Sequence, residues 1–290
     1  METKTIGFIG PGKIGLPICT HLVKAGYRVL GYRRGPMTEF EKMGGTPARS
    51  PAQIGAEADI VFACLPSDEA LEEVVRGPRG LVHSARGGQI VVELGSHPIP
   101  VKERYVAPLT EKGAIFLDGE VSGTPGMVAQ RKGVIYLGGD RDAARTIEPV
   151  IGAFADLCLY FGPFGAASKA KLVNNLLVAL HIAGTGQAMA IGLKAGVDVD
   201  LLIKAIATGS GGSTQFGIRA PWMAERRFLP QQGTAESLVH YLEMAKTFAE
   251  EVGAATPLLE CLLDIYRRAV PVVGERDVAA IVEMFERPEP

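Results

Sequence analysis

A lysine and two asparagines share one helical face in the stretch "SKAKLVNNLL", which begins at Ser168. Lys171, Asn174 and Asn175 are spaced i, i+3 and i+4, and Ser168 lies one turn earlier on the same side. Desolvation in a cleft lowers the pKa of a lysine and lets its amine exchange a proton near neutral pH. The amides could hold a hydroxyl or a carboxylate beside that amine. The stretch is therefore a candidate acid–base site, although a helix surface patch would show the same pattern.

A second group of polar residues follows an expected strand in "DGEVSGTPGM", from Asp118 to Met127. Ser122, Gly123 and Thr124 offer hydroxyls and backbone N–H groups in a turn, which is a common way to hold a small carboxylate. The alternative is a plain polar turn.

The pattern GxGxxG runs from Gly10 to Gly15, between an expected strand at Lys4–Ile9 and an expected helix at Ile14–Lys24. Gly10 allows the tight turn, Gly12 lets a pyrophosphate approach the backbone, and Gly15 lets helix and strand pack closely. The helix N-terminus adds free N–H groups and a positive dipole end. We expect a dinucleotide to contact this loop, including Lys13 and Ile14.

The residues after the second expected strand, Tyr27–Tyr32, indicate which dinucleotide binds. An acidic residue usually holds the ribose 2′-hydroxyl of NAD there, but this chain has Tyr32-Arg33-Arg34. Two guanidinium groups suit a 2′-phosphate. The sequence favours NADP(H) over NAD(H), unless the arginines are only solvated loop charges.

The distribution of expected elements divides the chain into two parts. Further apolar strands are expected at 59–65, 89–94, 114–118, 133–138 and 157–161, with helical patterns between several of them. This rhythm predicts an α/β fold: a doubly wound Rossmann domain over residues 1–163 that binds the dinucleotide. A long helix at 166–196 then leads into an all-α domain over residues 164–290 for substrate binding and oligomerisation.

Composition excludes several classes of protein. The net charge is −2, so no basic field attracts nucleic acid. The four scattered cysteines and the absence of a signal-like N-terminus favour a cytoplasmic protein. The long helix contains His181 and Gln187, and we expect a buried core helix instead of a membrane span. No HExxH or clustered acid set indicates a metal.

Taken together, the motifs resemble those of the β-hydroxyacid dehydrogenase family, which includes 3-hydroxyisobutyrate dehydrogenase, tartronate semialdehyde reductase and glyoxylate/succinic semialdehyde reductase. The family's glycine motif stands as "GFIGPGKIGLP", its substrate motif as "DGEVSGTP" and its lysine motif as "GAASKAKLVNN". The three occur in the family's order and spacing over nearly the whole chain.

The resemblance implies a Rossmann domain joined by a long helix to an all-α domain, in a homodimer or homotetramer. It implies that Lys171 donates a proton to a carbonyl oxygen while NADP(H) exchanges a hydride with a small 3-hydroxy acid or semialdehyde. Asn175 would orient the substrate, and Ser122, Gly123 and Thr124 would bind its carboxylate. Matching positions add cofactor contacts at Leu65, Pro66 and Ser96.

Three positions depart from the family's pattern. Glu93-Leu94-Gly95-Ser96 stands where Asp-x-Ser-Thr is frequent, Glu120 replaces a proline, and His240-Tyr241-Leu242 replaces Lys-Asp-Leu. His240 is a candidate substrate contact or a structural histidine. A related reductase of altered substrate, such as an imine reductase, and a non-catalytic NADP-binding sensor remain alternatives. The retained Lys171 counts against both.

Overall fold

The computed structural model describes residues 4–287 as two compact units, the first ending at Lys171 and the second beginning at Leu172. The long helix α9 (Ala166–Lys194) starts in the first unit and continues into the second. The expected boundary at 163/164 lies just before this helix, whereas the two units divide within its first turns.

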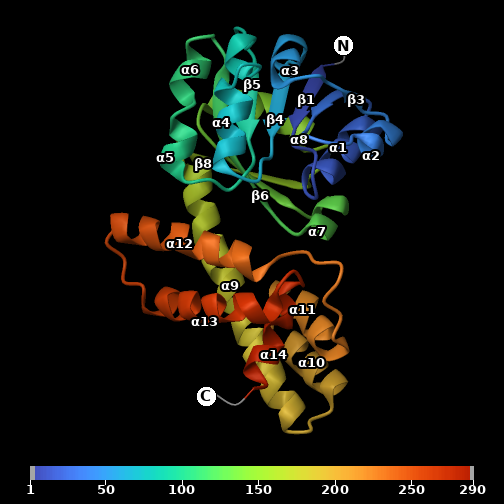
Figure 1. The fold of residues 1–290 in the computed structure, drawn as a ribbon, viewed down its shortest axis with the longest axis vertical. Helices are drawn as coiled ribbons and strands as arrows, with labels where there is room; N and C mark the ends of the chain where they lie inside the picture. The colour runs from blue at the N-terminus through green and yellow to red at the C-terminus, as the bar shows by residue number, and fades with distance from the viewer. Residues whose placement is uncertain (1–3, 288–290) are drawn as a thin grey trace. The chain divides into compact units, whose positions relative to one another are not determined.

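The first unit is built on one eight-stranded sheet with the order β3-β2-β1-β4-β5-β6-β7-β8 (Figure 1). Every neighbouring pair is parallel except β6 and β7, which run antiparallel. The strands are β1 Thr5–Ile9, β2 Arg28–Tyr32, β3 Thr46–Pro47, β4 Ile60–Ala63, β5 Ile90–Glu93, β6 Ile115–Ser122, β7 Val134–Gly138 and β8 Leu157–Gly162.

Helices cover both faces of this sheet because its central strands are apolar on both sides. Along β4, Ile60 and Phe62 belong to one buried cluster, and Val61 and Ala63 belong to another. The helices of the unit are α1 Gly15–Lys24, α2 Thr38–Lys42, α3 Pro51–Glu57, α4 Asp68–Arg76, α5 Ile99–Glu103, α6 Val106–Thr110, α7 Pro125–Ala129 and α8 Arg141–Ile151, with a 3₁₀ turn at Leu81–His83. Such a sheet is doubly wound, as the sequence predicts.

The second unit is helical throughout its described residues and packs around α9. Buried side chains of α9, among them Leu172, Ile182 and Met189, belong to a core that the later helices complete. These helices are α10 Val199–Thr208, α11 Thr214–Glu225, α12 Ala235–Glu251, α13 Pro257–Val273 and α14 Val282–Phe285, with a 3₁₀ turn at Val278–Ile281. Tyr266 on α13 donates a hydrogen bond to the Ala179 carbonyl on α9, 2.8 Å away.

The predicted strands and the long helix are confirmed, with differences at the edges. The two-residue strand β3 was not predicted, because "TP" is too short to show a periodicity. β6 runs to Ser122, beyond the predicted end at Asp118, and so includes Glu120. α9 ends at Lys194, just before the predicted end at Gly196.

Helix α9 combines a buried side with three exposed apolar side chains. Val173, Leu177 and Ile191 are each about half exposed or more and follow one line along the helix. Within the described part of the chain, α9 alone is long and apolar enough to span a bilayer by length and composition, with 44% of its most apolar window buried. Core helices meet the same criteria, so this feature is weak evidence for a span.

Packing around β2 generates a stability prediction. A Cβ at Gly31 would lie 2.4 Å from the ring of Phe40, which is only 2% exposed. Gly31→Ala should therefore force the ring to shift, at a cost of about 1–3 kcal/mol and a fall in Tm of roughly 2–8 °C. Gly87→Ala is the matched control, because a Cβ there meets nothing within 4 Å. Equal Tm values for the two variants by scanning calorimetry would contradict the packing described.

Candidate active site

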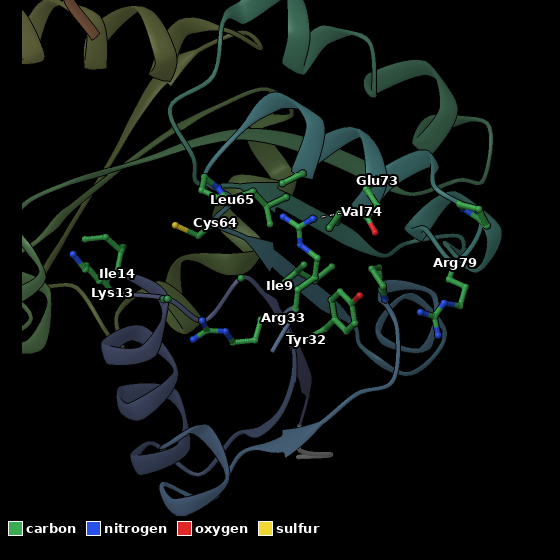
Figure 2. A pocket seen from close by; sticks show the side chains of 18 residues that line it. Ile9, Lys13, Ile14, Tyr32, Arg33, Cys64, Leu65, Glu73, Val74 and Arg79 are labelled. Atoms are coloured by element: carbon green, nitrogen blue, oxygen red, sulfur yellow. Dashed lines mark hydrogen bonds and ion pairs between the residues drawn. The ribbon is translucent and has the colours of Figure 1, made fainter. Parts of the chain in front are cut away.

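A cavity of about 590 Å³ opens at the carboxyl ends of β1, β2 and β4 (Figure 2). Figure 2 shows Lys13 and Ile14 at one end of the cavity and Arg79 at the other, with Tyr32 between them. Ten of the eleven predicted cofactor contacts line it: Gly10, Gly12, Lys13, Ile14, Gly15, Tyr32, Arg33, Arg34, Leu65 and Pro66. The first unit therefore brings these predicted residues together around one opening.

The three motif glycines have the backbone geometry that a dinucleotide requires. Gly10 has a φ of +84°, and a Cβ there would lie 2.3 Å from the Cys64 carbonyl oxygen. A Cβ at Gly15 would lie 2.4 Å from the ring of Phe8 on β1. At Gly12 the nearest atom to such a Cβ is 3.9 Å away, so this position faces open space. These residues fit a pyrophosphate passing close to Gly12.

The N-terminus of α1 provides the complementary dipole. The helix has ten residues, and its N-cap residue, Ile14, makes no side-chain capping bond among the described residues. The backbone N–H of Leu16 donates to the Gly12 carbonyl over 2.9 Å, and the positive end of the helix dipole is available to attract an anion. Lys13, beside them, is exposed.

Arg33 and Arg34 hold different partners. Arg33 Nη1 donates to the Pro11 carbonyl over 3.4 Å, and Arg34 Nη1 lies 3.5 Å from Glu73 Oε2 on α4. The side chains of Arg34 and Glu73 are 71% and 57% exposed. Exposed ion pairs contribute about 0–1 kcal/mol, less than the roughly 1.5–3 kcal/mol of a hydrogen bond to a charged group. A phosphate could therefore displace the Arg34–Glu73 pair, and the 3.4 Å bond of Arg33 is longer than an ordinary N–H···O hydrogen bond.

The cavity also contains residues that the sequence analysis did not single out. Cys64, Glu73 and Arg79 line it, although only Leu65 and Pro66 were expected from these loops. Burial raises the pKa of Cys64 to about 12, with a further contribution from Glu93, so its thiol stays protonated. Arg79 is exposed and lies in a loop after α4 with no local motif to mark it.

Lys171, the predicted acid–base residue, lies against the end of β6. Its Nζ donates a 2.8 Å hydrogen bond to the Val121 carbonyl, immediately before Ser122. Burial lowers the pKa of Lys171, while the nearby Glu120 carboxylate acts to raise it. The structure thus brings the amine next to the predicted carboxylate-binding turn and moves its pKa in the direction that acid–base work requires.

Two hydrogen bonds fix the start of α9 on β6. Buried Ser168 donates its backbone N–H to Asp118 Oδ2 over 2.9 Å and its hydroxyl to Asp118 Oδ1 over 2.6 Å. Because Lys171 lies one turn after Ser168, these bonds also set the position of its Cα. The sequence analysis placed Ser168 on the correct face but gave Asp118 no role.

The turn at Ser122–Thr124 is half-buried. Thr124 caps the five-residue helix α7 by accepting from the Met127 N–H over 3.3 Å. Gly123 has a φ of +155°, and a Cβ there would lie 3.2 Å from Gly133 Cα. Glycine therefore fits this close approach of two chain segments.

Beneath this turn lies a charge cluster that the sequence did not reveal. Lys102 on α5 is fully buried, and its Nζ lies 3.1 Å from Glu93, 3.1 Å from Asp118 and 3.0 Å from Glu120. The three carboxylates raise the pKa of Lys102 against the opposing effect of burial. Ser96 joins the cluster by donating to Glu120 Oε2 over 2.6 Å. Ser96 is not among the residues that line the cavity, so its cofactor contact stays a prediction.

His97 extends the cluster towards solvent. Its Nδ1 lies 2.7 Å from Asp68 Oδ1, and its Nε2 lies 3.5 Å from Glu93 Oε1. Burial acts to lower the pKa of His97, but Glu93 and then Asp68 raise it above its ordinary value. No sequence motif marks this histidine, because Asp68, the partner of its Nδ1, comes from a distant part of the chain.

Three predicted substrate contacts belong to the second unit. Asn175 lies one turn after Lys171 along α9, is 5% exposed, and has an Nδ2 without a hydrogen-bond partner among the described residues. Asn174 is half-buried, and His240 on α12 is exposed beside the ring of Tyr241. Their contacts with a substrate stay predictions. Over residues 4–287 no group of three or more His, Cys, Asp or Glu side chains could hold a metal ion.

Comparison with known proteins gives consistent matches over both units. The family model for the NAD-binding domain of 6-phosphogluconate dehydrogenase matches residues 5–162. A second model, the NAD-binding domain of NADP-dependent 3-hydroxyisobutyrate dehydrogenase, matches residues 165–285.

Two relatives and one solved structure match along almost their full lengths. The L-threonate dehydrogenase of Cupriavidus necator is 29% identical over 98% of this chain and 96% of its own. The NAD-dependent L-serine dehydrogenase of Pseudomonas aeruginosa is 28% identical over 98% of each. The structure of 3-hydroxyisobutyrate dehydrogenase from Mycobacterium tuberculosis with L-serine has the same fold, with a TM-score of 0.86 at 24% identity over 98% of this chain and 100% of that one.

The raised pKa of His97 predicts a pH-dependent contribution to stability. A protonated His97 between Asp68 and Glu93 stabilises the folded state fully below the unfolded pKa of about 6.5, and this contribution is lost as the pH rises through the folded pKa. His97→Gln should therefore lower Tm more at pH 6 than at pH 9. Exposed His83→Gln, which loses only a bond to the Gly77 carbonyl, is the control for the loss of an imidazole at each pH. A deficit for His97→Gln that grows with pH would be inconsistent with this.

Proposed function

The chain belongs to the β-hydroxyacid dehydrogenase family, and we propose that it transfers a hydride between NADP(H) and a small 3-hydroxy acid or its semialdehyde, with Lys171 as general acid and base. One observation carries this proposal: the partly buried amine of Lys171 is held at the Val121 carbonyl, beside the turn at Ser122–Thr124. The proposed proton carrier and the proposed carboxylate-binding turn thus adjoin, in the unit that also contains the cavity proposed for the dinucleotide.

The chain's residues would hold the cofactor by its phosphates. Gly12 and the N-terminus of α1 would hold the pyrophosphate, and Arg33 and Arg34 would exchange their weak present contacts for the 2′-phosphate. Leu65, Pro66 and Ser96 would complete the contacts. The second family model, of an NADP-dependent enzyme, supports this choice, although one relative is NAD-dependent. When bound, the nicotinamide supplies a hydride to a carbonyl carbon or accepts one from an alcohol.

Lys171 would carry the proton that accompanies the hydride. In reduction its protonated Nζ donates to the carbonyl oxygen, and in oxidation the neutral amine accepts the hydroxyl proton. Ser122, Gly123 and Thr124 would hold the substrate carboxylate. The unpartnered Nδ2 of Asn175 would donate to the substrate, with Asn174 and His240 as further contacts.

Serine and threonate, the substrates in the names of two relatives, are both small hydroxylated carboxylates. This supports a substrate of the same class here. The exposed apolar side chains of Val173, Leu177 and Ile191 on α9 support assembly into a homodimer or homotetramer. The four cysteines are free, which is consistent with a cytoplasmic location.

Removing the amine tests the proposed chemistry. Lys171→Ala should lower the NADPH-dependent reduction of a panel of small aldehydes by at least about 10²-fold, the lower end of the usual contribution of a general acid. NADPH binding, followed by cofactor fluorescence, should persist. Lys169→Ala is the matched control, because Lys169 is exposed two residues earlier on the same helix. Turnover by Lys171→Ala close to that of Lys169→Ala would exclude the role assigned to this lysine.

Cofactor choice is tested at the two arginines. Arg33→Asp combined with Arg34→Ala should lower the ratio of kcat/KM for NADPH over NADH by about ten- to a hundredfold, because contacts worth roughly 1.5–3 kcal/mol are lost and a carboxylate now repels the phosphate. The exposed Arg145 on α8 lies outside the cavity lining, and Arg145→Ala should leave the ratio unchanged. An unchanged ratio in the double variant would mean that these arginines do not select the cofactor.

A further inference from the structure

The charge cluster around Lys102 contains more carboxylates than cations. Glu93, Asp118 and Glu120 surround one ammonium, and all four side chains are at most 2% exposed. An ammonium has three N–H donors. The three N–H groups of Lys102 donate hydrogen bonds to Asp118 Oδ1, the Gly119 carbonyl and Glu120 Oε1. Glu93 Oε2 therefore lies 3.1 Å from Nζ without a hydrogen bond among the described residues.

An excess of buried negative charge attracts a further cation or retains a proton. Lys171 supplies the next positive charge, since its Nζ donates to the carbonyl of Val121, the residue that follows Glu120 on β6. Ser168, one turn before Lys171, places its hydroxyl 3.3 Å from Glu120 Oε1. Helix α9 thus approaches the cluster on the side of Glu120.

The hydrogen bonds of Glu120 are those that an ionised carboxylate receives. It accepts from Ser96 Oγ on one oxygen, over 2.6 Å, and from Lys102 Nζ on the other, over 3.0 Å. Both groups act as donors here, and a carboxylate that receives such bonds is favoured in its charged form. A proline at this position, as in the related family pattern, could make none of these contacts.

We propose that Glu120 is a positioning residue that holds Lys171 in its protonated, proton-donating form and so suits this chain to carbonyl reduction at neutral pH. The proposal rests on the proposed function, since it concerns the same lysine. Without the charge of Glu120, burial alone would act on the Lys171 amine, and more of it would be neutral. A neutral amine is a base, which serves the oxidation of an alcohol instead.

The mutual influence of the two groups agrees with this geometry. Burial lowers the pKa of Lys171 and Glu120 opposes that effect. Burial holds the pKa of Glu120 above its ordinary value, although Lys102 and then Lys171 act to lower it.

The other titratable groups of the cluster come from several elements: Cys64 after β4, Glu93 on β5, His97 before α5, Lys102 on α5 and Asp118 on β6. Of these and Glu120, Glu120 alone perturbs the pKa of Lys171. Glu93→Gln is therefore a matched control, because it removes a carboxylate from Lys102 without removing the charge that acts on Lys171.

The test measures the titration of Lys171 directly in the ligand-free protein. Dinitrofluorobenzene labels neutral amines, and peptide mass spectrometry reports the labelling of Lys171 at each pH. In Glu120→Gln the labelling rate at pH 8 should rise roughly tenfold, because an opposite charge close to an amine changes its pKa by about one unit or more. In Glu93→Gln it should remain within about twofold of wild type. An unchanged or slower rate in Glu120→Gln overturns the proposal.

Enzyme kinetics supply the second readout. Glu120→Gln should shift the rise of kcat/KM for oxidation to lower pH and lower the rate of reduction above neutral pH. If Glu120→Gln does not fold, Ser96→Ala must shift the labelling in the same direction by a smaller amount, because it removes one bond that favours the charged form of Glu120.

The two readouts separate this inference from the proposed function. If the protein reduces aldehydes but the titration of Lys171 is the same in Glu120→Gln as in wild type, this inference is wrong and the proposed function stands. If the titration of Lys171 shifts in Glu120→Gln but the protein turns over no substrate, the proposed function is wrong and the coupling between Glu120 and Lys171 is supported.

Discussion

The paired hydrogen bonds between Asp118 and Ser168 are the constraint on which the arrangement of the site depends. They tie the first turn of α9 to the middle of β6, so that Lys171 meets the Val121 carbonyl at the end of the same strand. The amine therefore lies next to the Ser122–Thr124 turn, and its position is set by buried, satisfied polar groups. A loop would not fix it as precisely, because loops have fewer buried contacts.

Asp118 can hold Ser168 in this way because its negative charge is balanced inside the first unit. Lys102 neutralises it and also approaches Glu93 and Glu120. Without this ammonium, the three carboxylates would be like charges buried together. Removing one partner of a buried ion pair commonly costs about 3–5 kcal/mol, so this cluster fixes its members in place. The same cluster also affects the charge of Lys171. It sets a carboxylate near a partly buried lysine, and burial and charge then act on the lysine amine in opposite directions.

The parts of the structure that follow local rules could be predicted from the sequence. The glycine motif specifies its own turn, and the continuous apolar runs specify buried parallel strands, so the fold and ten of the residues that line the cavity could be predicted. The charge cluster could not, since Lys102 and its partners Asp118 and Glu120 come from different elements. A lysine in a short helix looks like a surface residue until the fold brings carboxylates to it. Arg33 and Arg34 were expected to act as a pair because they are adjacent, yet adjacent side chains diverge and hold separate partners.

The central claim is that the amine of Lys171 moves the proton in the reaction. Chemical rescue of Lys171→Ala by small primary amines tests it most directly, with aldehyde reduction followed by NADPH oxidation. Added methylamine and ethylamine should restore activity in proportion to their concentration, and amines of different pKa should differ in rate as general acids do. A folded variant that binds NADPH as the wild type does, but whose turnover no amine raises above the buffer rate, would contradict the account.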